Sequence, residues 1–290
     1  MQWSIGFAKN DLASIIRQKK TDVKFNWLPS SNNNTSMADP FLLEVNEDTI
    51  KVLYEDFSMV NPGVYGKIVL GVYDRKLKLL FKKEILDNTT HCSYPLVFKE
   101  NGKTYVLPES CQSNQLCLYE YDTEKQELKN KKVLLNNLPL LDCTPLKYNN
   151  KYWLFATMGD ETNDHTKLYI FYSDSLLGPY TMHKNNPIKQ GLNGIRSGGN
   201  FFIVDNELYR PAQNCNLYYG ESLTINKIIK LTEDEFEEEP YLKLKGDKSS
   251  QFNAGLHTLN VLNDIMVVDG IRMVFMPLKK LRNFFNKLYK

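Results

Sequence analysis

The sequence predicts an all-β chain that folds as a five-bladed β-propeller with a short C-terminal amphipathic helix. One hairpin pattern, in which apolar and aromatic residues flank a polar turn, occurs five times. The copies are regularly spaced, with steps of 55, 50, 55 and 58 residues between the equivalent positions Pro40, Pro95, Pro145, Asn200 and Thr258. A repeat of about this length that carries strands rather than helices is typical of propeller blades.

The turns of these hairpins support the prediction. Asn101-Gly102, Asn149-Asn150, Asp205-Asn206 and Asn263-Asp264 tolerate the positive φ angles that two-residue hairpin turns require. Five unrelated hairpins in a β-sandwich are the alternative, because sandwiches also contain short strands at regular intervals.

A single propeller is expected over residues 1–276, with blades opening near residues 39, 93, 142, 197 and 256. Residues 3–8 are apolar and are expected to form an N-terminal strand that completes the last blade. The polar residues 30–36 are expected to form a loop near the site. The acidic run at residues 233–239 is expected on a solvated edge or loop, with an acidic metal or partner site as the alternative.

The tail at residues 277–290 differs from the rest of the chain. Its apolar residues recur at helical spacing between lysines and an arginine, which predicts a basic amphipathic helix. Such a helix would lie on an anionic membrane surface or pack against the side of the propeller.

Composition narrows the setting. A net charge of +2, from 36 basic and 34 acidic residues, gives no overall attraction to nucleic acid. Five cysteines without framework spacing favour a reduced, cytoplasmic environment. We see no signal peptide and no apolar stretch of about 18 residues, so the expected location is the cytoplasm, at the inner face of the membrane if the tail binds there.

Polar residues at the start of the inner strands of a propeller converge on one end of its axis. The candidates at these positions are Asp39, His91, Ser93, Asp142, Arg196 and His257, and the ends of the second strands add Glu55, Glu109, Arg210 and Gln213. Two carboxylates with separated pKa values are what glycosyl transfer through an oxocarbenium-like transition state needs. No metal or cofactor is predicted.

Each candidate also has a structural explanation. Asp39 precedes a proline, where aspartate often caps a turn, and His91 and His257 could be core histidines. Cys143 fits a small buried apolar residue better than a nucleophile. The glycines at 194–199 are expected to let a ligand approach the backbone, with Arg196 facing a phosphate or carboxylate.

Several segments carry a resemblance to a known family. They are 38–42, 91–95, 108–109, 142–144, 172–179, 208–214, 219–220 and 256–260. In these segments the chain resembles the five-bladed propeller domain found at the N-terminus of plant glucosamine inositolphosphorylceramide transferases and encoded in bacterial surface-polysaccharide loci. The segments cover nearly the whole chain in order.

More distantly, the chain is similar to arabinanase, xylosidase and levansucrase propellers. The resemblance implies that Asp39 is a base or nucleophile and that Asp142 is an orienting carboxylate. Where those propellers place a fourth-blade acid, this chain has Arg196. A cation there suits a phosphate leaving group, which needs stabilisation rather than protonation. Glu109 or Glu55 would supply a displaced acid.

The leading hypothesis is a glycosyltransferase of bacterial surface-polysaccharide biosynthesis that uses a sugar phosphate or nucleotide sugar. The assigned roles are Asp39 as base, Asp142 as orienting carboxylate, Arg196 and Arg210 as phosphate contacts, and His91, Glu109 and His257 as sugar contacts, with Ser93, Glu55 and Gln213 lining the site. A glycoside hydrolase acting on a furanoside, with Glu109 as acid, and a non-catalytic carbohydrate-binding propeller are the alternatives.

Overall fold

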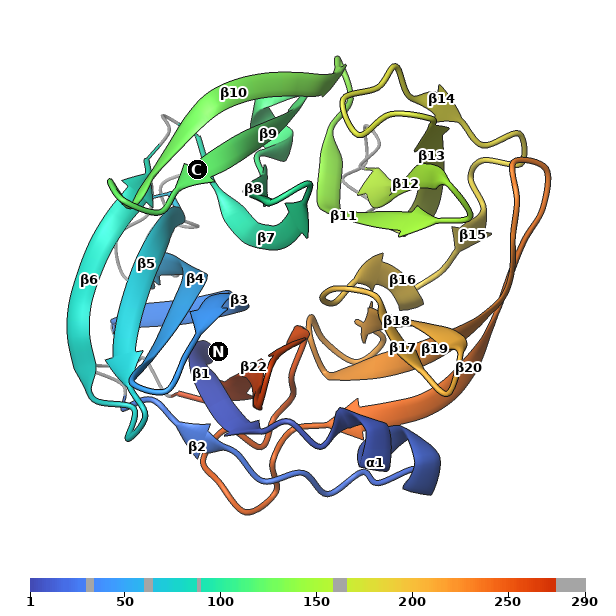
Figure 1. Ribbon diagram of the computed structural model, residues 1–290. Helices are drawn as coiled ribbons and strands as arrows, with labels where there is room; N and C mark the ends of the chain where they lie inside the picture. Colours follow the sequence, from blue (N-terminus) through green and yellow to red (C-terminus); the bar gives the residue numbers. More distant parts are fainter. Residues whose placement is uncertain (30–33, 60–64, 88–89, 159–165, 275–290) are drawn as a thin grey trace, which may run out of the picture.

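The computed structural model describes residues 1–29, 34–59, 65–87, 90–158 and 166–274. In this part of the chain, five sheets of four or five strands surround one axis (Figure 1). The predicted five-bladed propeller is therefore confirmed. The expected amphipathic tail at 277–290 and most of the polar tract at 30–36 lie outside the described residues.

The strands follow the blades in chain order. Blade 1 contains β3 (Thr35–Val45), β4 (Thr49–Ser58), β5 (Lys67–Asp74) and β6 (Leu79–Leu86). Blade 2 contains β7 (Ser93–Glu100), β8 (Lys103–Glu109), β9 (Gln115–Asp122) and β10 (Glu127–Asn136), with a 3₁₀ turn at Cys111–Ser113. Blade 3 contains β11 (Leu140–Tyr148), β12 (Lys151–Met158), β13 (Lys167–Ser173), β14 (Thr181–Met182) and β15 (Lys189–Gln190).

The last two blades are less regular. Blade 4 contains β16 (Asn193–Ser197), β17 (Phe202–Val204), β18 (Glu207–Asn214), β19 (Ser222–Leu231) and β20 (Phe236–Lys245). Blade 5 contains β21 (Leu259–Leu262), β22 (Ile265–Arg272), β1 (Gln2–Lys9) and β2 (Asn26–Trp27), so it joins the two ends of the described chain.

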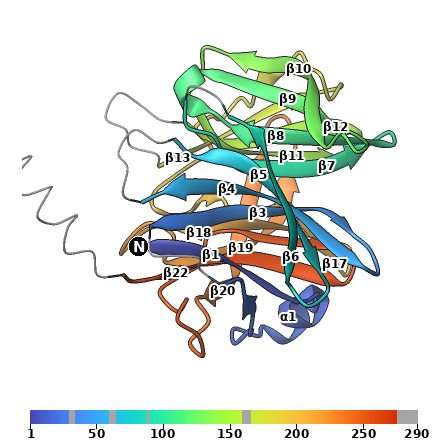
Figure 2. The same cartoon turned by 90° about the vertical axis from the view of Figure 1, so that its left-hand side faces the viewer.

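The ring is closed by β1, as the sequence predicted. β1 pairs antiparallel with β22 in continuous register from Gln2 opposite Arg272 to Lys9 opposite Ile265. Its apolar residues Ile5 and Phe7 are buried in a cluster with residues of β4, β5 and β22. β1, β3 and β22 accordingly lie side by side in the view from the edge of the propeller (Figure 2). This strand therefore holds blade 5 against blade 1.

Between β1 and β2 the chain forms α1 (Leu12–Gln18), which the sequence reading did not predict. Leu12, Ile15 and Ile16 stand at helical spacing and are buried against apolar residues of blades 4 and 5. In the described part of the chain no helix is long and apolar enough to cross a bilayer.

Blade 4 departs from the predicted hairpin at its glycines. β16 and β17 both pair with β18, and Gly198 and Gly199 lie between them. A Cβ atom on Gly199 would lie 2.0 Å from the Leu259 carbonyl oxygen, and one on Gly198 would lie 2.8 Å from that of His257. The expectation that these glycines admit a ligand is therefore wrong, because they admit the backbone of blade 5.

The acidic run also needs a correction. Most of it lies in β20, the outer strand of blade 4, which agrees with a solvated edge. Glu238 within it, however, has a buried side chain that forms ion pairs with Arg210 and Lys189.

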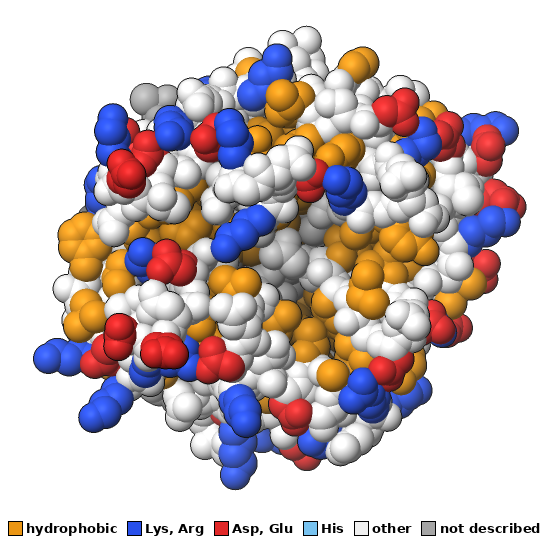
Figure 3. Space-filling view, viewed as in Figure 1, with side chains coloured by type: hydrophobic (Ala, Val, Ile, Leu, Met, Phe, Trp, Pro, Cys, Tyr) orange, Lys and Arg blue, Asp and Glu red, His pale blue; other side chains and the backbone are white. Residues whose placement is uncertain are grey.

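The two ends of the axis differ in character. At the hairpin end of the inner strands, a cavity of about 330 Å³ is lined by apolar residues such as Leu146, Phe201 and Val261, together with Lys99 and Glu100. Figure 3 shows this end, with hydrophobic side chains around the central hollow. Apart from Arg210, the predicted site residues lie near the start of the inner strands or in the later half of the second strands, so they lie at the opposite end.

We expect Ile5→Ala to lower the free energy of unfolding by about 2–5 kcal/mol, because it leaves a cavity beneath the closing strand. Ile203→Ala on β17 is the matched control, since Ile203 is 64% exposed and Ile5 is 0% exposed. The control should change stability by no more than about 0.5 kcal/mol. Urea denaturation followed by circular dichroism measures both, and equal losses would contradict the role given to β1.

Candidate active site

Three inner strands carry the same backbone distortion. The register shifts between Ala38 and Phe41 in β3, between Ser93 and Leu96 in β7, and between Leu141 and Thr144 in β11. Each shift is a β-bulge, and the residue after its first edge has a positive φ: 51° at Asp39, 43° at Tyr94 and 48° at Asp142. Left-handed non-glycine residues are uncommon, and bulges often lie next to active sites.

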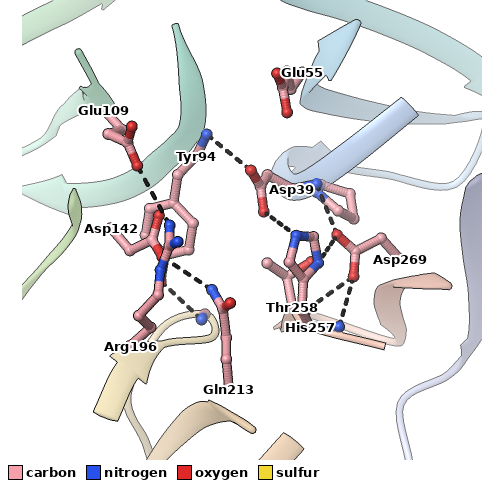
Figure 4. A network of polar contacts seen from close by, with 12 residues as sticks. Asp39, Glu55, Tyr94, Glu109, Asp142, Arg196, Gln213, His257, Thr258 and Asp269 are labelled. Carbon is pink, nitrogen blue, oxygen red and sulfur yellow. Dashed lines mark hydrogen bonds and ion pairs between the residues drawn. The ribbon is translucent and has the colours of Figure 1, made fainter. Parts of the chain in front are cut away.

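The second strands add carboxylates at matching positions. Glu55 pairs with Ala38 and Glu109 pairs with Ser93, directly before the bulges of blades 1 and 2. Glu55, Glu109, Ser93, Asp39 and Asp142 are all buried. The bulges and the second strands therefore bring the predicted carboxylates to one end of the axis, as Figure 4 shows.

One part of the site is centred on Arg196. Its Nε lies 2.7 Å from Asp142 Oδ2, and its Nη2 lies 3.8 Å from Glu109 Oε2, beyond hydrogen-bond distance. Gln213 Nε2 donates to the same Asp142 oxygen at 3.0 Å and to the Ser197 carbonyl oxygen at 2.8 Å. The guanidinium carbon lies 5.2 Å from the ring centre of Tyr219, which supports it from one side.

A second part is centred on His257. Its Nδ1 lies 2.6 Å from Asp269 Oδ2, and its Nε2 lies 3.5 Å from Asp39 Oδ1. The other oxygen of Asp39 accepts the backbone N–H of Tyr94 at 3.2 Å. Asp39 therefore has contacts from blades 2 and 5 while it belongs to blade 1.

His91 lies at the edge of the site and is the most exposed of the predicted residues. Its Nε2 is 3.3 Å from Glu55 Oε1, and its Nδ1 accepts the backbone N–H of Gly66 at 3.1 Å. A Cβ atom on Gly66 would lie 2.1 Å from Glu55 Oε1, so only glycine fits beside this carboxylate. His91 and Glu55 therefore form a pair at the edge of the site, and Glu55 is close enough to act on the Asp39 carboxylate.

Arg210 does not join the site, which corrects its predicted role as a phosphate contact. It is completely buried and forms two hydrogen bonds to Glu238, at 2.8 and 2.6 Å, and others to the carbonyl oxygens of Gly194 and Ile195. Arg210 and Gln213 stand three residues apart on β18, so they point to opposite faces of the sheet. Arg210 is a structural residue of blade 4.

Four residues of the site were missed by the sequence reading: Trp3, Tyr94, Tyr219 and Asp269. Asp269 is the most informative of them. Like Glu55 and Glu109 it lies in the second strand of its blade, although it follows the start of that strand by four residues and they follow theirs by six. A carboxylate in the second strand of a third blade was therefore a usable signal. Tyr94 occupies the bulge position of blade 2 that Asp39 and Asp142 occupy in theirs, but no residue type marks that position.

Burial controls the charges of the carboxylates. It raises the pKa of Asp39 well above its ordinary value; His257 opposes this shift, and Asp269 and Glu55 add to it. Burial, with Glu109 nearby, also raises the pKa of Glu55. Burial and Asp142 raise the pKa of Glu109 to about 8 although Arg196 opposes them. Glu109 is therefore protonated at neutral pH.

The histidines are shifted in opposite directions. Burial lowers the pKa of His91 and favours its neutral form. Burial also disfavours a charged His257, but Asp269 and Asp39 outweigh it and raise the pKa of this imidazole. Both ring nitrogens of His257 face carboxylates, so a doubly protonated ring would satisfy Asp39 and Asp269 without an ion. We assign no metal to this group, although its donor atoms lie within 4.8 Å of one another.

Comparison with known proteins identifies the family of the chain. The family model described as "Glucosamine inositolphosphorylceramide transferase 1, N-terminal" matches residues 27–262. The chain belongs to this family. The resemblance predicted from the sequence motifs is thus confirmed, and the matched region includes all the site residues except Trp3 and Asp269.

Similar proteins in this family come from plants. Glucosamine inositolphosphorylceramide transferase 1 of Oryza sativa subsp. japonica is 37% identical over 211 residues, which cover 70% of this chain and 28% of that protein. The protein of the same name from Arabidopsis thaliana is 35% identical over 210 residues, which cover 70% of this chain and 26% of that protein. The chain thus spans little more than a quarter of these relatives.

Among solved structures, similar folds occur in glycoside hydrolases. A family 117 glycoside hydrolase of Zobellia galactanivorans matches with a TM-score of 0.56 and 12% identity, over 96% of this chain and 97% of that one. A family 43 β-1,3-galactosidase matches with a TM-score of 0.55 and 9% identity, over 74% and 81% of the two chains. These likenesses show a shared propeller fold.

We expect Arg210→Met to lower the free energy of unfolding by about 3–5 kcal/mol, because it leaves Glu238 buried without its arginine partner. Arg17→Met is the matched control: Arg17 also forms two hydrogen bonds to one carboxylate, that of Asp205, but its side chain is 59% exposed. The control should cost no more than about 1 kcal/mol. Thermal and urea unfolding of both variants measure the difference, and similar costs would refute a structural role for Arg210.

The pH dependence of stability tests Glu109. Its folded-state pKa of about 8 lies above the ordinary 4.5, so the folded state holds the proton more tightly. The stability from this group is complete below about pH 4.5 and is lost as the pH rises towards 8. Glutamine has no proton to lose, so the free energy of unfolding of Glu109→Gln should rise relative to that of the unmodified protein. The expected rise is on the order of 1 kcal/mol per pH unit between pH 5 and 8.

Urea titrations at pH 5, 6.5 and 8 measure this difference. Glu124→Gln, at an exposed turn, is the control and should follow the unmodified protein at all three values. Parallel curves for Glu109→Gln and the unmodified protein would mean that Glu109 is ionised like an exposed glutamate.

Proposed function

We propose that this protein is a glycosyltransferase that moves a sugar from a phosphate-activated donor to a glycan acceptor. The observation that carries the proposal is that the Asp39 carboxylate of blade 1 and the Arg196 guanidinium of blade 4, which pairs with Asp142, lie at the same end of the axis (Figure 4). Membership in a family described by a transferase name supports it. So do the two plant relatives, which are named as transferases.

Asp39 is suited to be the base. Its two oxygens are oriented by His257 and by the N–H of Tyr94, at 3.5 and 3.2 Å, so the carboxylate is fixed before the substrate binds. In the transfer step it accepts the proton of the acceptor hydroxyl. The hydroxyl oxygen forms a bond to the anomeric carbon of the donor sugar as the bond from that carbon to the phosphate oxygen breaks.

Arg196 is suited to the leaving phosphate, which departs with the bonding electron pair. Asp142 engages Nε, and Tyr219 supports the plane of the guanidinium. The terminal nitrogens have no hydrogen bond to the described residues, and 14% of the side chain is exposed. Their N–H groups are thus available to an anionic oxygen, and a phosphate needs such a cation rather than an acid.

The protonation of the glutamates makes an anionic donor compatible with an acidic site. A fully ionised set of carboxylates would repel a phosphate. Burial raises the pKa of Glu109 to about 8, so this side chain is neutral at physiological pH, and burial shifts Glu55 in the same direction, towards its neutral form. They can then donate hydrogen bonds to sugar oxygens, which is the role proposed for Glu109.

Glycoside hydrolysis is the second candidate, and the state of Glu109 favours it. A protonated glutamate next to the Asp142 carboxylate has the properties of a general acid, and Asp39 would then act as nucleophile or base. The substrate would be a neutral oligosaccharide, such as a furanoside, and Arg196 would serve only to hold Asp142.

The biological setting is a further part of the proposal. We place the enzyme in bacterial surface-polysaccharide assembly, in the cytoplasm and against the inner face of the membrane through the basic tail at 277–290. The charge pattern of the tail supports this placement, and membrane-surface work would suit an enzyme whose plant relatives carry a lipid in their name.

Saturation-transfer NMR tests the donor class. Nucleotide sugars, sugar phosphates and neutral oligosaccharides are screened against the unmodified protein, Arg196→Ala and the control Arg17→Ala. We expect a phosphate-bearing sugar to bind, and Arg196→Ala to weaken it at least about tenfold because a charged hydrogen bond is lost. Arg17→Ala changes an exposed side chain of α1 and should bind as the unmodified protein does.

Binding of neutral oligosaccharides alone, unaffected by Arg196→Ala, would refute the transferase and favour the hydrolase or a binding module. Comparing the rate at which the unmodified protein and Asp39→Asn turn over the bound sugar separates the hydrolase from the binding module. An enzyme should lose about 100-fold or more in rate while it keeps its ligand, whereas a binding module shows no turnover to lose.

A further inference from the structure

The contacts of Asp269 reach both the side chain and the backbone around Asp39. Asp269 is completely buried in β22, and neither the motifs nor the family model includes it. Its Oδ2 lies 2.6 Å from His257 Nδ1 and also accepts the backbone N–H of Asp39 at 2.9 Å. One carboxylate of blade 5 thus contacts the left-handed residue of blade 1 and the imidazole that faces it.

The second oxygen of Asp269 binds the backbone of the segment that carries His257. Oδ1 accepts the backbone N–H groups of His257 at 3.0 Å and Thr258 at 2.9 Å. Asp269 therefore has four contacts, three of them to backbone amides. A carboxylate held in this way is ionised, and its orientation cannot change without breaking several hydrogen bonds.

Aromatic side chains confine the His257 ring on the sides that do not face Asp39 or Asp269. Trp3 stacks on it with ring centres 3.9 Å apart and an interplanar angle of 22°, and Tyr219 meets it edge-on at 5.2 Å. Trp3 is itself close-packed, because a Cβ atom on Gly220 would lie 2.4 Å from its ring. Nε2 of His257 is therefore held towards Asp39.

The charges around His257 come from several blades. Asp39 on β3 and Asp269 on β22 are in contact with it, and Asp142 on β11 acts on it from farther away. Trp3 on β1 and Tyr219, before β19, are its uncharged neighbours. Among the groups that influence Asp39, His257 is the cation, while Asp269, Glu55 and Asp142 are all acidic.

We propose that Asp269 and His257 form a positioning pair for Asp39. Asp269 fixes the imidazole with both nitrogens protonated, and the Nε2–H aimed at Asp39 then favours the ionised form of that carboxylate against its burial and holds it in one rotamer. Asp269 contacts no reacting atom and acts through His257 and through the backbone of Asp39. The proposal rests on the proposed function only in naming Asp39 as the base, since the pair itself is a property of the folded chain.

The test is a pH titration of the histidine side chains by NMR, using protein labelled with ¹⁵N-histidine. The chain has four histidines, so the spectrum is simple, and His257→Gln identifies the signal of His257. We expect both nitrogens of His257 to be protonated at pH 7 in the unmodified protein. In Asp269→Asn the midpoint should fall by about one to three pH units, the effect of losing a contacting charge.

Asp247→Asn is the matched control. Asp247 is likewise buried and accepts the N–H groups of Phe25, Trp27 and Ser249, but it lies outside the site. This variant should leave the His257 midpoint unchanged even if it loses as much stability as Asp269→Asn. A neutral His257 at pH 7 in the unmodified protein would overturn the proposal. That measurement needs no variant, so it decides the matter even if Asp269→Asn fails to fold.

A second readout separates this proposal from the function. If a transfer or hydrolysis activity is found, the rising limb of its pH profile should move to higher pH in Asp269→Asn, with a loss in kcat that exceeds any change in KM. An unchanged profile in folded Asp269→Asn would refute the positioning role. If no activity is found but His257 titrates as expected, the proposed function fails and the positioning pair remains.

Discussion

At the start of three inner strands the backbone turns into the left-handed region, and this turn places Asp39, Tyr94 and Asp142 at the end of the axis. The residue inserted by each bulge breaks the strict alternation of a strand. Without the inserted residue, the side chain at the bulge position would point to the other face of the blade rather than into the site. The strain of a positive φ at non-glycine residues is maintained because the contacts from other blades fix these residues: Asp269 accepts the N–H of Asp39, and Asp39 accepts that of Tyr94.

The same residue types therefore have different roles, depending on the face of the sheet that they occupy. Arg196 and Arg210 lie in adjacent strands of blade 4, and each meets a buried carboxylate. The Arg210 side chain is buried inside the blade, where it donates hydrogen bonds to Glu238 and to two carbonyl oxygens. Arg210 therefore only stabilises the blade. Arg196 lies at the open end, where Asp142 uses one donor and leaves the terminal nitrogens available. Burial also shifts Glu55 and Glu109 towards their neutral forms. The exposed carboxylates of the outer strands are not buried in this way.

The fold could be predicted from sequence because each blade repeats one hairpin and its polar turn, which are local features. The convergence of the carboxylates followed from propeller geometry. The predictions that were wrong or missing depend on the direction of side chains and on the packing between blades. Arg210 was assigned to the site because the sequence does not show which face of β18 it occupies. The glycines near residue 198 were assigned to a ligand because the approach of blade 5 is visible only in three dimensions. Asp269 was missed because its partners, Asp39 and His257, are brought to it by the closure of the ring.

That closure also bears on how the molecule is made. β1 finds its partner β22 only after more than 250 further residues have been joined to the chain, since their register runs from Gln2 with Arg272 to Lys9 with Ile265. While the ribosome synthesises blades 1 to 4, the strand that carries Trp3, Ile5 and Phe7 lacks its long partner and has only the two-residue strand β2 to pair with. Unpaired strands of this kind are prone to pair with other chains. Because this contact is so distant in the chain, one edge of β1 stays open to pairing with other chains until β22 has been synthesised.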